Sequence, residues 1–185
     1  MVTLRKDTTH LPIRIGVSGC LLGEEVRFDG GHKRDSFLVE TLGPIVEWVS
    51  VCPEVEAGFG TPREAIQLVR DPTDLDGVRL ATRHTGVDLT RRMRKYARRR
   101  VRELTKEQLS GYILKKDSPT CGMEQVKVWH HSGTNESNGQ GIFAGELLRQ
   151  FPTMPVEEEG HLHDPQLLEN FLDRVFMYHR LQNYG

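Results

Sequence analysis

The three cysteines of the chain, Cys20, Cys52 and Cys121, are the side chains best suited to specialised chemistry. They are 32 and 69 residues apart, so they match no local metal motif of the CxxC kind. Each lies beside or close to glycine or proline, as in Gly19-Cys20 and Cys52-Pro53. Free cysteine is often a plain core residue, but a buried strand cysteine needs no turn chemistry around it. The neighbours therefore favour thiols held at loop tips.

Three thiolates allow more than one metal chemistry. They could hold a zinc ion with one open position, or three irons of a 4Fe-4S cluster whose fourth iron has no protein ligand. Soft, all-thiolate ligation favours iron–sulfur, because catalytic zinc sites usually include histidine. A disulfide pair with one free thiol is the weaker alternative. The polar start of the chain, MVTLRKDTTHLP, does not resemble a secretion signal, so we expect a reducing, cytoplasmic location.

Polar residues beside the cysteines are the candidates for acid–base and binding roles. Glu54 follows Cys52 by two residues and is the acid best placed to reach a metal pocket. Ser118 precedes Cys121 by three residues and offers a hydroxyl, which in a turn is also an ordinary structural group. Around the first cysteine the candidates for binding substrate are Ser18, Arg27 and Asp29, although the last two could simply pair with each other.

The elements that must position these residues alternate between strands and helices. The segments 13–18, 44–52 and 111–115 are short, apolar and rich in β-branched residues, which predicts buried strands that end close to a cysteine. Helices are predicted at 35–42, 88–104 and 142–150, and weaker strands at 77–82 and 154–157. This alternation predicts an α/β fold with a mostly parallel sheet flanked by helices. The carboxyl ends of parallel strands share one edge, so the three cysteines should converge there.

Two other segments are predicted to lack strands. Residues 54–66 contain Gly58, Gly60 and Pro62 and should form a loop, with Thr61–Glu64 resembling the capped start of a helix. Arg63 within it remains a candidate contact for an anion or a base. Residues 133–141 are polar and rich in glycine, which predicts an exposed loop.

The end of the chain predicts a C-terminal helical extension. Asp164 and Pro165 form a good cap and first-turn pair, and a broad nonpolar face follows. The helix could dock on its own domain or connect to a partner or a further domain. We therefore expect an N-terminal arm at 1–12, an α/β domain at 13–158, and a linker with a C-terminal helix at 159–185.

The composition of the chain indicates its general class, and one segment differs from the rest in its charge. The chain has 185 residues, 37% hydrophobic, with a net charge of −1, which indicates one ordinary domain and excludes a membrane protein. Residues 91–102, however, hold eight basic residues and no acid. Such a run is usually a solvated face, but it lacks the acids that helical ion pairs need. A phosphate-binding surface is the functional alternative, formed on one helix side by Arg91, Arg94, Lys95, Arg98 and Arg102.

Three segments together resemble the thiouracil desulfidase family: VSGCLLGEEVRFDGG, VCPEVEAGFGTPREAI and YILKKDSPTCG. The resemblance runs from about Ile13 to Val156 and implies a Rossmann-like α/β domain. It also implies a 4Fe-4S cluster on Cys20, Cys52 and Cys121, with the family's catalytic glutamate and serine at Glu54 and Ser118. One departure is Phe28, where tyrosine is common, and it removes only a phenolic hydroxyl.

The activity implied by the resemblance is hydrolytic and non-redox. Sulfur would leave as sulfide from a thiolated pyrimidine, 4-thiouracil or 4-thiouridine, either free or within tRNA. Residues 155–180 resemble the junction in longer members, which continue into a second domain and resemble tRNA 4-thiouridine desulfidases. We expect that second domain to be absent here. The alternatives are a zinc-dependent hydrolase at the same cysteines and a non-catalytic RNA-binding module.

Overall fold

The parallel sheet has four strands in the order β2-β1-β5-β8. The computed structural model describes residues 11–71, 73 and 77–184, so the predicted N-terminal arm lies outside the described residues except for its last two. The strands are β1 (Arg14–Ser18), β2 (Glu47–Val51), β5 (Leu109–Leu114) and β8 (Val156–Glu158), and each neighbouring pair is parallel. The strand order reverses at β1, which has β2 on one side and β5 on the other. This is the switch point at which such sheets bind ligands.

A second, mixed sheet has the order β4-β3-β6-β7 and was not expected. Its strands are β3 (Ile66–Arg70), β4 (Val78–Thr82), β6 (Val126–Trp129) and β7 (Asn135–Gly139). Two antiparallel hairpins are joined by the parallel pair β3–β6. The prediction of a loop over 133–141 was therefore wrong. β7 is an exposed edge strand, so it carries no apolar alternation that would reveal it in the sequence.

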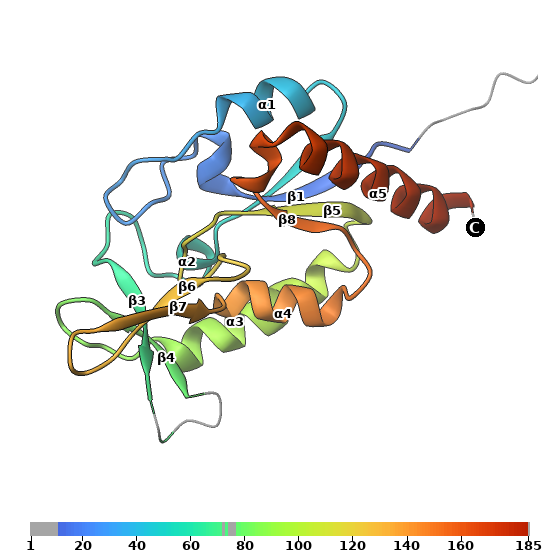
Figure 1. Ribbon diagram of the computed structural model, residues 1–185. Coiled ribbons are helices and arrows are strands. Elements are labelled where there is room, and N and C mark those ends of the chain that lie inside the picture. The colour runs from blue at the N-terminus through green and yellow to red at the C-terminus, as the bar shows by residue number, and fades with distance from the viewer. Residues whose placement is uncertain (1–10, 72, 74–76, 185) are drawn as a thin grey trace, which may run out of the picture.

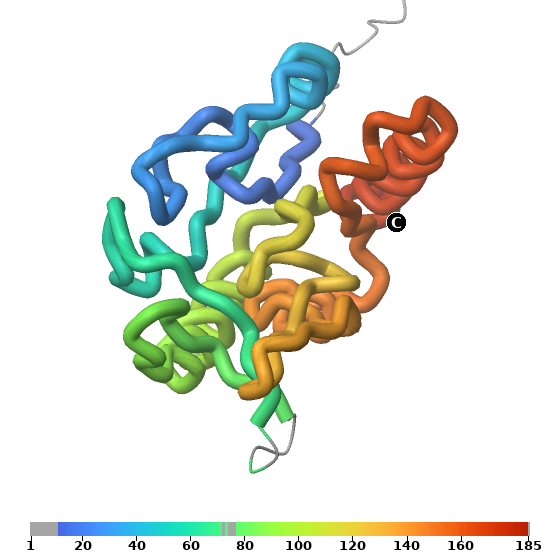
Figure 2. The backbone as a smooth tube through the Cα atoms, turned by 60° about the vertical axis from the view of Figure 1, so that its left-hand side comes forward, coloured from blue at the N-terminus to red at the C-terminus, as the bar shows by residue number. Residues whose placement is uncertain are grey.

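Helices cover both faces of the parallel sheet (Figure 1). On one face lie α1 (Ser36–Leu42) and α5 (Pro165–Tyr184), and on the other lie α3 (Thr90–Leu104) and α4 (Ile142–Gln150). Figure 2 likewise places α1 and α5 at one end of the molecule and α3 and the hairpins at the other. Each face has its own hydrophobic core. The predicted α/β architecture is confirmed, with the mixed sheet as an addition to it.

The segment after β2 differs from its prediction. A short helix, α2 (Pro53–Glu56), begins directly at Cys52, where a loop was expected. Thr61–Glu64 does not start a helix, and the strand β3 follows it directly. Glu64 instead accepts hydrogen bonds from the N–H (2.8 Å) and hydroxyl (2.7 Å) of Thr85. A long-range contact thus replaces the expected capping box.

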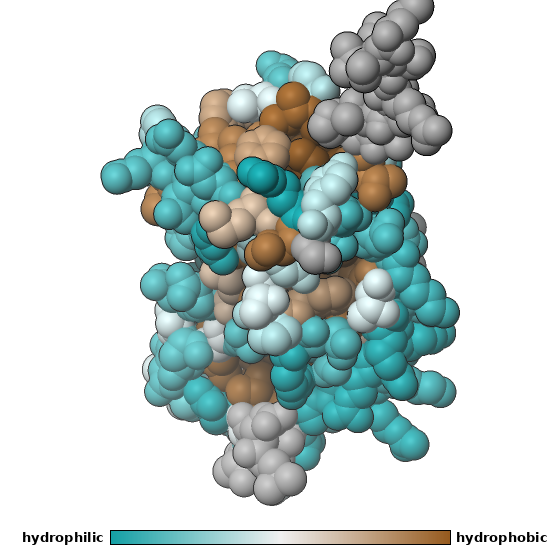
Figure 3. All heavy atoms as spheres, turned by 90° about the vertical axis from the view of Figure 1, so that its right-hand side faces the viewer, coloured by the Kyte–Doolittle hydropathy of each residue, from teal (hydrophilic) through white to brown (hydrophobic). Residues whose placement is uncertain are grey.

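The C-terminal helix α5 docks on the chain's own parallel sheet. Phe171 and Val175 are buried, and a Cβ built on Gly111 of β5 would lie 2.8 Å from Val175, so the helix depends on glycine there. The outer side of α5 leaves Met177, Leu181 and Tyr184 exposed. In Figure 3, hydrophobic surface gathers in the upper half, the level at which Figure 1 places this helix. None of the described helices is both long enough and apolar enough to cross a membrane.

Candidate metal-binding active site

All three cysteines line one cavity of about 520 Å³. Cys20 lies in the 3-10 helix Gly19–Leu22 after β1, Cys52 is the N-cap of α2 after β2, and Cys121 follows β5. The cavity therefore sits at the carboxyl edge of the parallel sheet, at its switch point. All three thiols are free, so the disulfide alternative is wrong for this structure.

The surroundings keep the free thiols protonated. Burial, and then the charge of Glu54, raises the pKa of Cys20 to about 11 and that of Cys52 to about 12. The same two causes raise the pKa of the buried Cys121 well above its usual value. Thiolates at neutral pH thus need a positively charged partner, which bound metal supplies.

The donors that line this cavity are three free thiols and, among the described residues, no histidine, a set that suits an iron–sulfur cluster better than a catalytic zinc ion. Within the described ranges, no three histidine, cysteine or acidic side chains are grouped closely enough to hold one metal ion. In an iron–sulfur cluster each cysteine binds a different iron, so the thiolates lie farther apart than around zinc. All three thiols line one cavity, where each could bind a different iron.

Glu54 is buried within this site and held in place by two contacts. The Cys52 thiol lies 3.5 Å from Glu54 Oε2, and the hydroxyl of Thr120 donates to Glu54 Oε1. The hydroxyls of Ser118 and Thr120 are 3.0 Å apart. Because the Thr120 proton points to Glu54, the Ser118 hydroxyl donates to Thr120. A hydrogen-bonded chain therefore runs from Ser118 through Thr120 to the carboxylate.

Ser118 also shapes the loop that carries the third cysteine. Its Oγ accepts hydrogen bonds from the N–H groups of Cys121 (3.0 Å) and Thr120 (3.3 Å). The backbone returns close by, since a Cβ on Gly122 would lie 2.8 Å from the Ser118 carbonyl oxygen. Sequence reasoning identified Ser118 and missed Thr120, whose one local signal is its place directly before Cys121.

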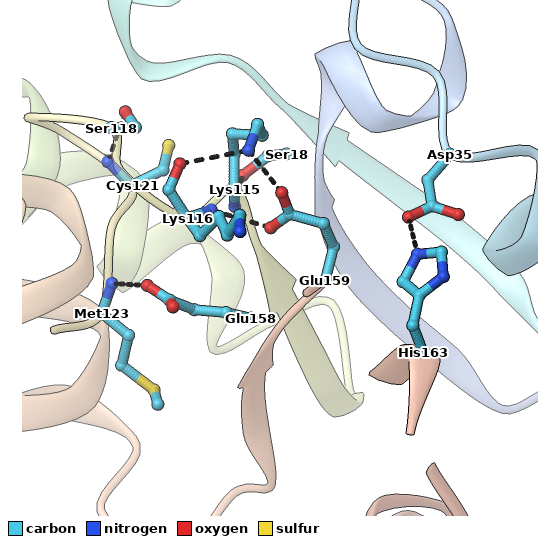
Figure 4. Close-up of polar contacts among 10 residues, drawn as sticks. All are labelled: Ser18, Asp35, Lys115, Lys116, Ser118, Cys121, Met123, Glu158, Glu159 and His163. Carbon is cyan, nitrogen blue, oxygen red and sulfur yellow. Dashed lines mark hydrogen bonds and ion pairs between the residues drawn. The ribbon is translucent and has the colours of Figure 1, made fainter. Parts of the chain in front are cut away.

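Two neighbouring acids hold the two ends of the loop that carries Cys121, as Figure 4 shows. They are Glu158, the last residue of β8, and Glu159, which follows it. Glu159 accepts from the Lys116 N–H (2.8 Å) and pairs with the Lys115 ammonium. Glu158 accepts from the Met123 N–H at 2.7 Å. Their strand pairs with β5, which brings this acidic run to the cysteine loop. The sequence showed the acids and gave no sign of this position.

The predicted substrate-binding residues do not all reach the cavity. Ser18 lines it, and the Lys115 N–H donates to its Oγ at 3.0 Å. Arg27 lines it too, with its guanidinium 5.4 Å from the centre of the Phe28 ring. Asp29 does not line it. Its carboxylate is exposed and accepts from the Gly31 N–H (3.0 Å), which lowers its pKa, and lies 3.7 Å from Arg27.

Cations outnumber acids around the cavity. Arg63 donates to the carbonyl oxygens of Val26 and Gly60, both at 2.9 Å, and so ties the first cysteine loop to the segment before β3. Its Nε is buried with no hydrogen-bond partner among the described residues. The acids lining the cavity are Glu54 and Asp117, and the cations are Arg27, Lys33, Arg63, Arg83, Lys115 and Lys116.

The predicted basic face lies elsewhere on the molecule. Arg91, Arg94, Lys95, Arg98 and Arg102 line a different surface cavity, which none of the cysteines lines. The structure therefore places the sequence-predicted residues, apart from Asp29, in two sites.

Comparisons with known proteins agree with the fold and the motifs. A model of the 2-thiouracil desulfurase family matches residues 15–159, a range that holds all three cysteines. The uncharacterized protein YbbK of Bacillus subtilis (strain 168) is 32% identical over 136 residues, 72% of this chain and 88% of YbbK. The solved structure of a 4Fe-4S-dependent thiouracil desulfidase, TudS, has a TM-score of 0.67 and 27% identity, covering 86% of this chain and 98% of that one. The chain belongs to the 2-thiouracil desulfurase family.

Proposed function

We propose that this protein removes sulfur, as sulfide, from the thiocarbonyl group of a thiolated pyrimidine. The observation that carries the proposal is the convergence of three free thiols and a buried carboxylate on one cavity. The family, and the 4Fe-4S dependence of the similar TudS structure, support it. Cys20, Cys52 and Cys121 would hold a 4Fe-4S cluster, and the free thiols fit a reducing, cytoplasmic location.

The cluster would supply, when bound, an iron without a protein ligand, a Lewis acid with high affinity for sulfur. The overall reaction consumes one water and releases one hydrogen sulfide, so that the C=S group becomes C=O without net electron transfer. The protein residues must then deliver the water and move its protons.

Glu54 is the residue that would take a proton from the water. Water is a poor nucleophile, and a positioned carboxylate makes it a better one. Thr120 fixes one carboxylate oxygen by hydrogen bonding, and Ser118 fixes Thr120. Ser118 would therefore orient the base and keep Cys121 in place, a more indirect role than proton transfer.

The mouth of the cavity offers groups that suit a pyrimidine. The Phe28 ring lines it and is 40% exposed, which leaves a face on which a base can stack. Ser18 and Arg27 would contact the substrate, while Asp29 would act through Arg27.

Anaerobic reconstitution followed by metal analysis and a sulfide-release assay tests the proposal. We expect about four irons and four sulfides per chain, and sulfide release from 4-thiouracil or 4-thiouridine. Cys20→Ser, Cys52→Ser and Cys121→Ser should each lose the broad visible absorption and the activity together. One equivalent of zinc with no iron uptake would favour the hydrolase alternative instead. A fully loaded protein that released no sulfide from either substrate would contradict the proposal.

A further inference from the structure

The guanidinium of Arg63 has one edge that the protein does not use. Its Nη1 donates to the carbonyl oxygens of Val26 and Gly60, both at 2.9 Å, and lies 3.5 Å from the Thr61 hydroxyl. Among the described residues, Nε and Nη2 have no hydrogen-bond partner, and of these two Nε is buried while Nη2 is not. We name the edge formed by Nε and Nη2 the Arg63 fork. Buried donors are nearly always paired, so an unpaired one calls for an explanation.

The Arg63 fork is held rigidly at the wall of the cysteine cavity. The Arg63 N–H donates to the Phe28 carbonyl oxygen at 2.8 Å, so the backbone and the side chain of Arg63 both bind the first cysteine loop. Two carbonyl acceptors on Nη1 also keep the guanidinium from rotating. The fork is therefore oriented before any ligand arrives, and a donor pair that is already oriented loses little conformational freedom on binding.

The Arg63 fork lies close to the thiols. The Val26 carbonyl oxygen that accepts from Arg63 at 2.9 Å is also 3.9 Å from the Cys52 sulfur. The guanidinium nitrogen can therefore be no farther from that sulfur than these two distances combined. The electrostatics agree, because burial and then Glu54 raise the pKa of the Cys52 thiol, and the charge of Arg63 opposes them. Arg63, Cys52, Glu54 and Phe28 all line the one cavity.

The acceptor that fits this position is a carbonyl oxygen on a pyrimidine ring. A planar guanidinium fork binds an oxygen that lies in its own plane. Thiouracils carry one C=S and one C=O group, on the two carbons that flank N3. With the sulfur directed at the cysteines, the oxygen lies on the same edge of the ring, beside N3. A phosphate group is separated from that edge by a ribose, so it is a poorer match for a donor so close to the thiols.

We infer that the Arg63 fork donates to the ring carbonyl oxygen of the thiolated pyrimidine and selects substrates that carry this oxygen. The inference rests on the proposed function. The Phe28 ring would hold the face of the base while Arg63 holds its edge, which directs the thiocarbonyl carbon toward Glu54. A site built to hydrogen-bond a substrate atom rejects analogues without that atom, because its own buried donor is then left unpaired.

Two substrates that differ only in this oxygen test the contact. 4-Thiouracil has the ring carbonyl, whereas pyrimidine-4-thione lacks it and keeps the C=S group. The kcat/KM of the cluster-loaded wild type should favour 4-thiouracil by about 10- to 100-fold, the scale of a hydrogen bond from a charged donor. Arg63→Lys keeps the positive charge but has no fork, so the preference should fall to about threefold or less.

Arg92→Lys is the matched control. Arg92 donates to the Gly58 carbonyl oxygen at 3.0 Å, so it holds the same segment of chain, and it does not line the cysteine cavity. The preference of this variant should equal that of the wild type. Equal losses on both substrates in Arg63→Lys would make Arg63 a structural tie alone and overturn the inference. So would a wild type without any preference, a result that depends on no variant.

Binding without turnover separates the Arg63 contact from the proposed function. Uracil has both carbonyl oxygens and no sulfur to release, and 4-pyrimidinone lacks the oxygen assigned to Arg63. Calorimetry on the cluster-loaded protein should show tighter binding of uracil, and Arg63→Lys should abolish the difference. If this result accompanies a complete lack of sulfide release from thiolated pyrimidines, the proposed function fails and the Arg63 contact stands. Equal binding of the two compounds to the wild type would overturn the contact.

Discussion

The two sheets of this protein contribute different kinds of residue to the cysteine cavity. Every cysteine follows the carboxyl end of a strand of the parallel sheet, Cys121 within the loop after β5. The mixed sheet and the segments leading into and out of it supply Arg63, Ile66 and Arg83 to the cavity wall. Parallel strands that are covered on both faces bring sequence-distant ends to one edge. The hairpins of the mixed sheet contribute only because they lie beside that edge. We therefore expect changes at the parallel sheet to affect chemistry and changes at the mixed sheet to affect binding.

The largest effect should come from Glu54, beside the end of β2. Glu54→Gln keeps the size of the side chain and removes the base, so kcat should fall by roughly 100-fold or more with an unchanged cluster spectrum. Glu56→Gln is the matched control. Glu56 accepts from the Tyr96 hydroxyl (2.7 Å) and the Cys52 N–H (3.1 Å), so its change should lower stability and not turnover per loaded protein. Wild-type turnover in the fully loaded Glu54→Gln variant would show that the carboxylate takes no part in the mechanism. Ser118→Ala should lower kcat less than Glu54→Gln does.

A second test concerns Glu158, which ties β8 to the cysteine loop. Glu158→Ala leaves the Met123 N–H without its acceptor, which should cost about 1–3 kcal/mol of unfolding free energy, measured by urea denaturation. Glu158→Gln keeps an acceptor oxygen and should restore most of that loss. Equal stability of the Ala and Gln variants would mean that the contact does not hold the loop.

The pH dependence separates the charge of Glu158 from its hydrogen bond. Burial raises the pKa of Glu158 in the folded protein above its usual 4.5. The folded state then holds this proton more tightly, so stability from this group is greatest below pH 4.5 and declines as pH rises through the folded pKa. Glu158→Gln should lack that decline. Parallel pH profiles of unfolding for the wild type and Glu158→Gln would contradict the assignment.

The smallest effect should come from the mixed sheet, at Arg83. This exposed side chain follows β4, lines the cavity and lies 5.9 Å from the Trp129 ring centre. Arg83→Gln should raise KM by about threefold, the scale of an exposed charged contact, and leave kcat unchanged. Steady-state kinetics on 4-thiouridine measures both constants. A fall in kcat to the level of Glu54→Gln would contradict the view that the mixed sheet affects binding and the parallel sheet affects chemistry.

The sequence by itself determined the parallel core of the fold and the identity of the thiols. β1 and β5 were visible because strands buried on both faces need apolar runs, and the half-buried edge strand β2 was visible from its β-branched and aromatic residues. The helix α3 was visible because its buried stripe recurs at helical spacing. Once those strands were placed, the convergence of Cys20, Cys52 and Cys121 followed from topology alone.

Only the tertiary structure decided which polar residues join the thiols. Thr120 meets Glu54 across 66 positions of sequence, and Lys116 meets Glu159 across 43, so neither pair leaves a local pattern. Asp29 stands near Cys20 in the sequence, yet it caps its own turn and stays outside the cavity. The edge strand β7 was hidden because backbone hydrogen bonds, which any residue can make, hold it in place. Periodicity records burial, and it does not record which partner a polar side chain finds after the chain has folded.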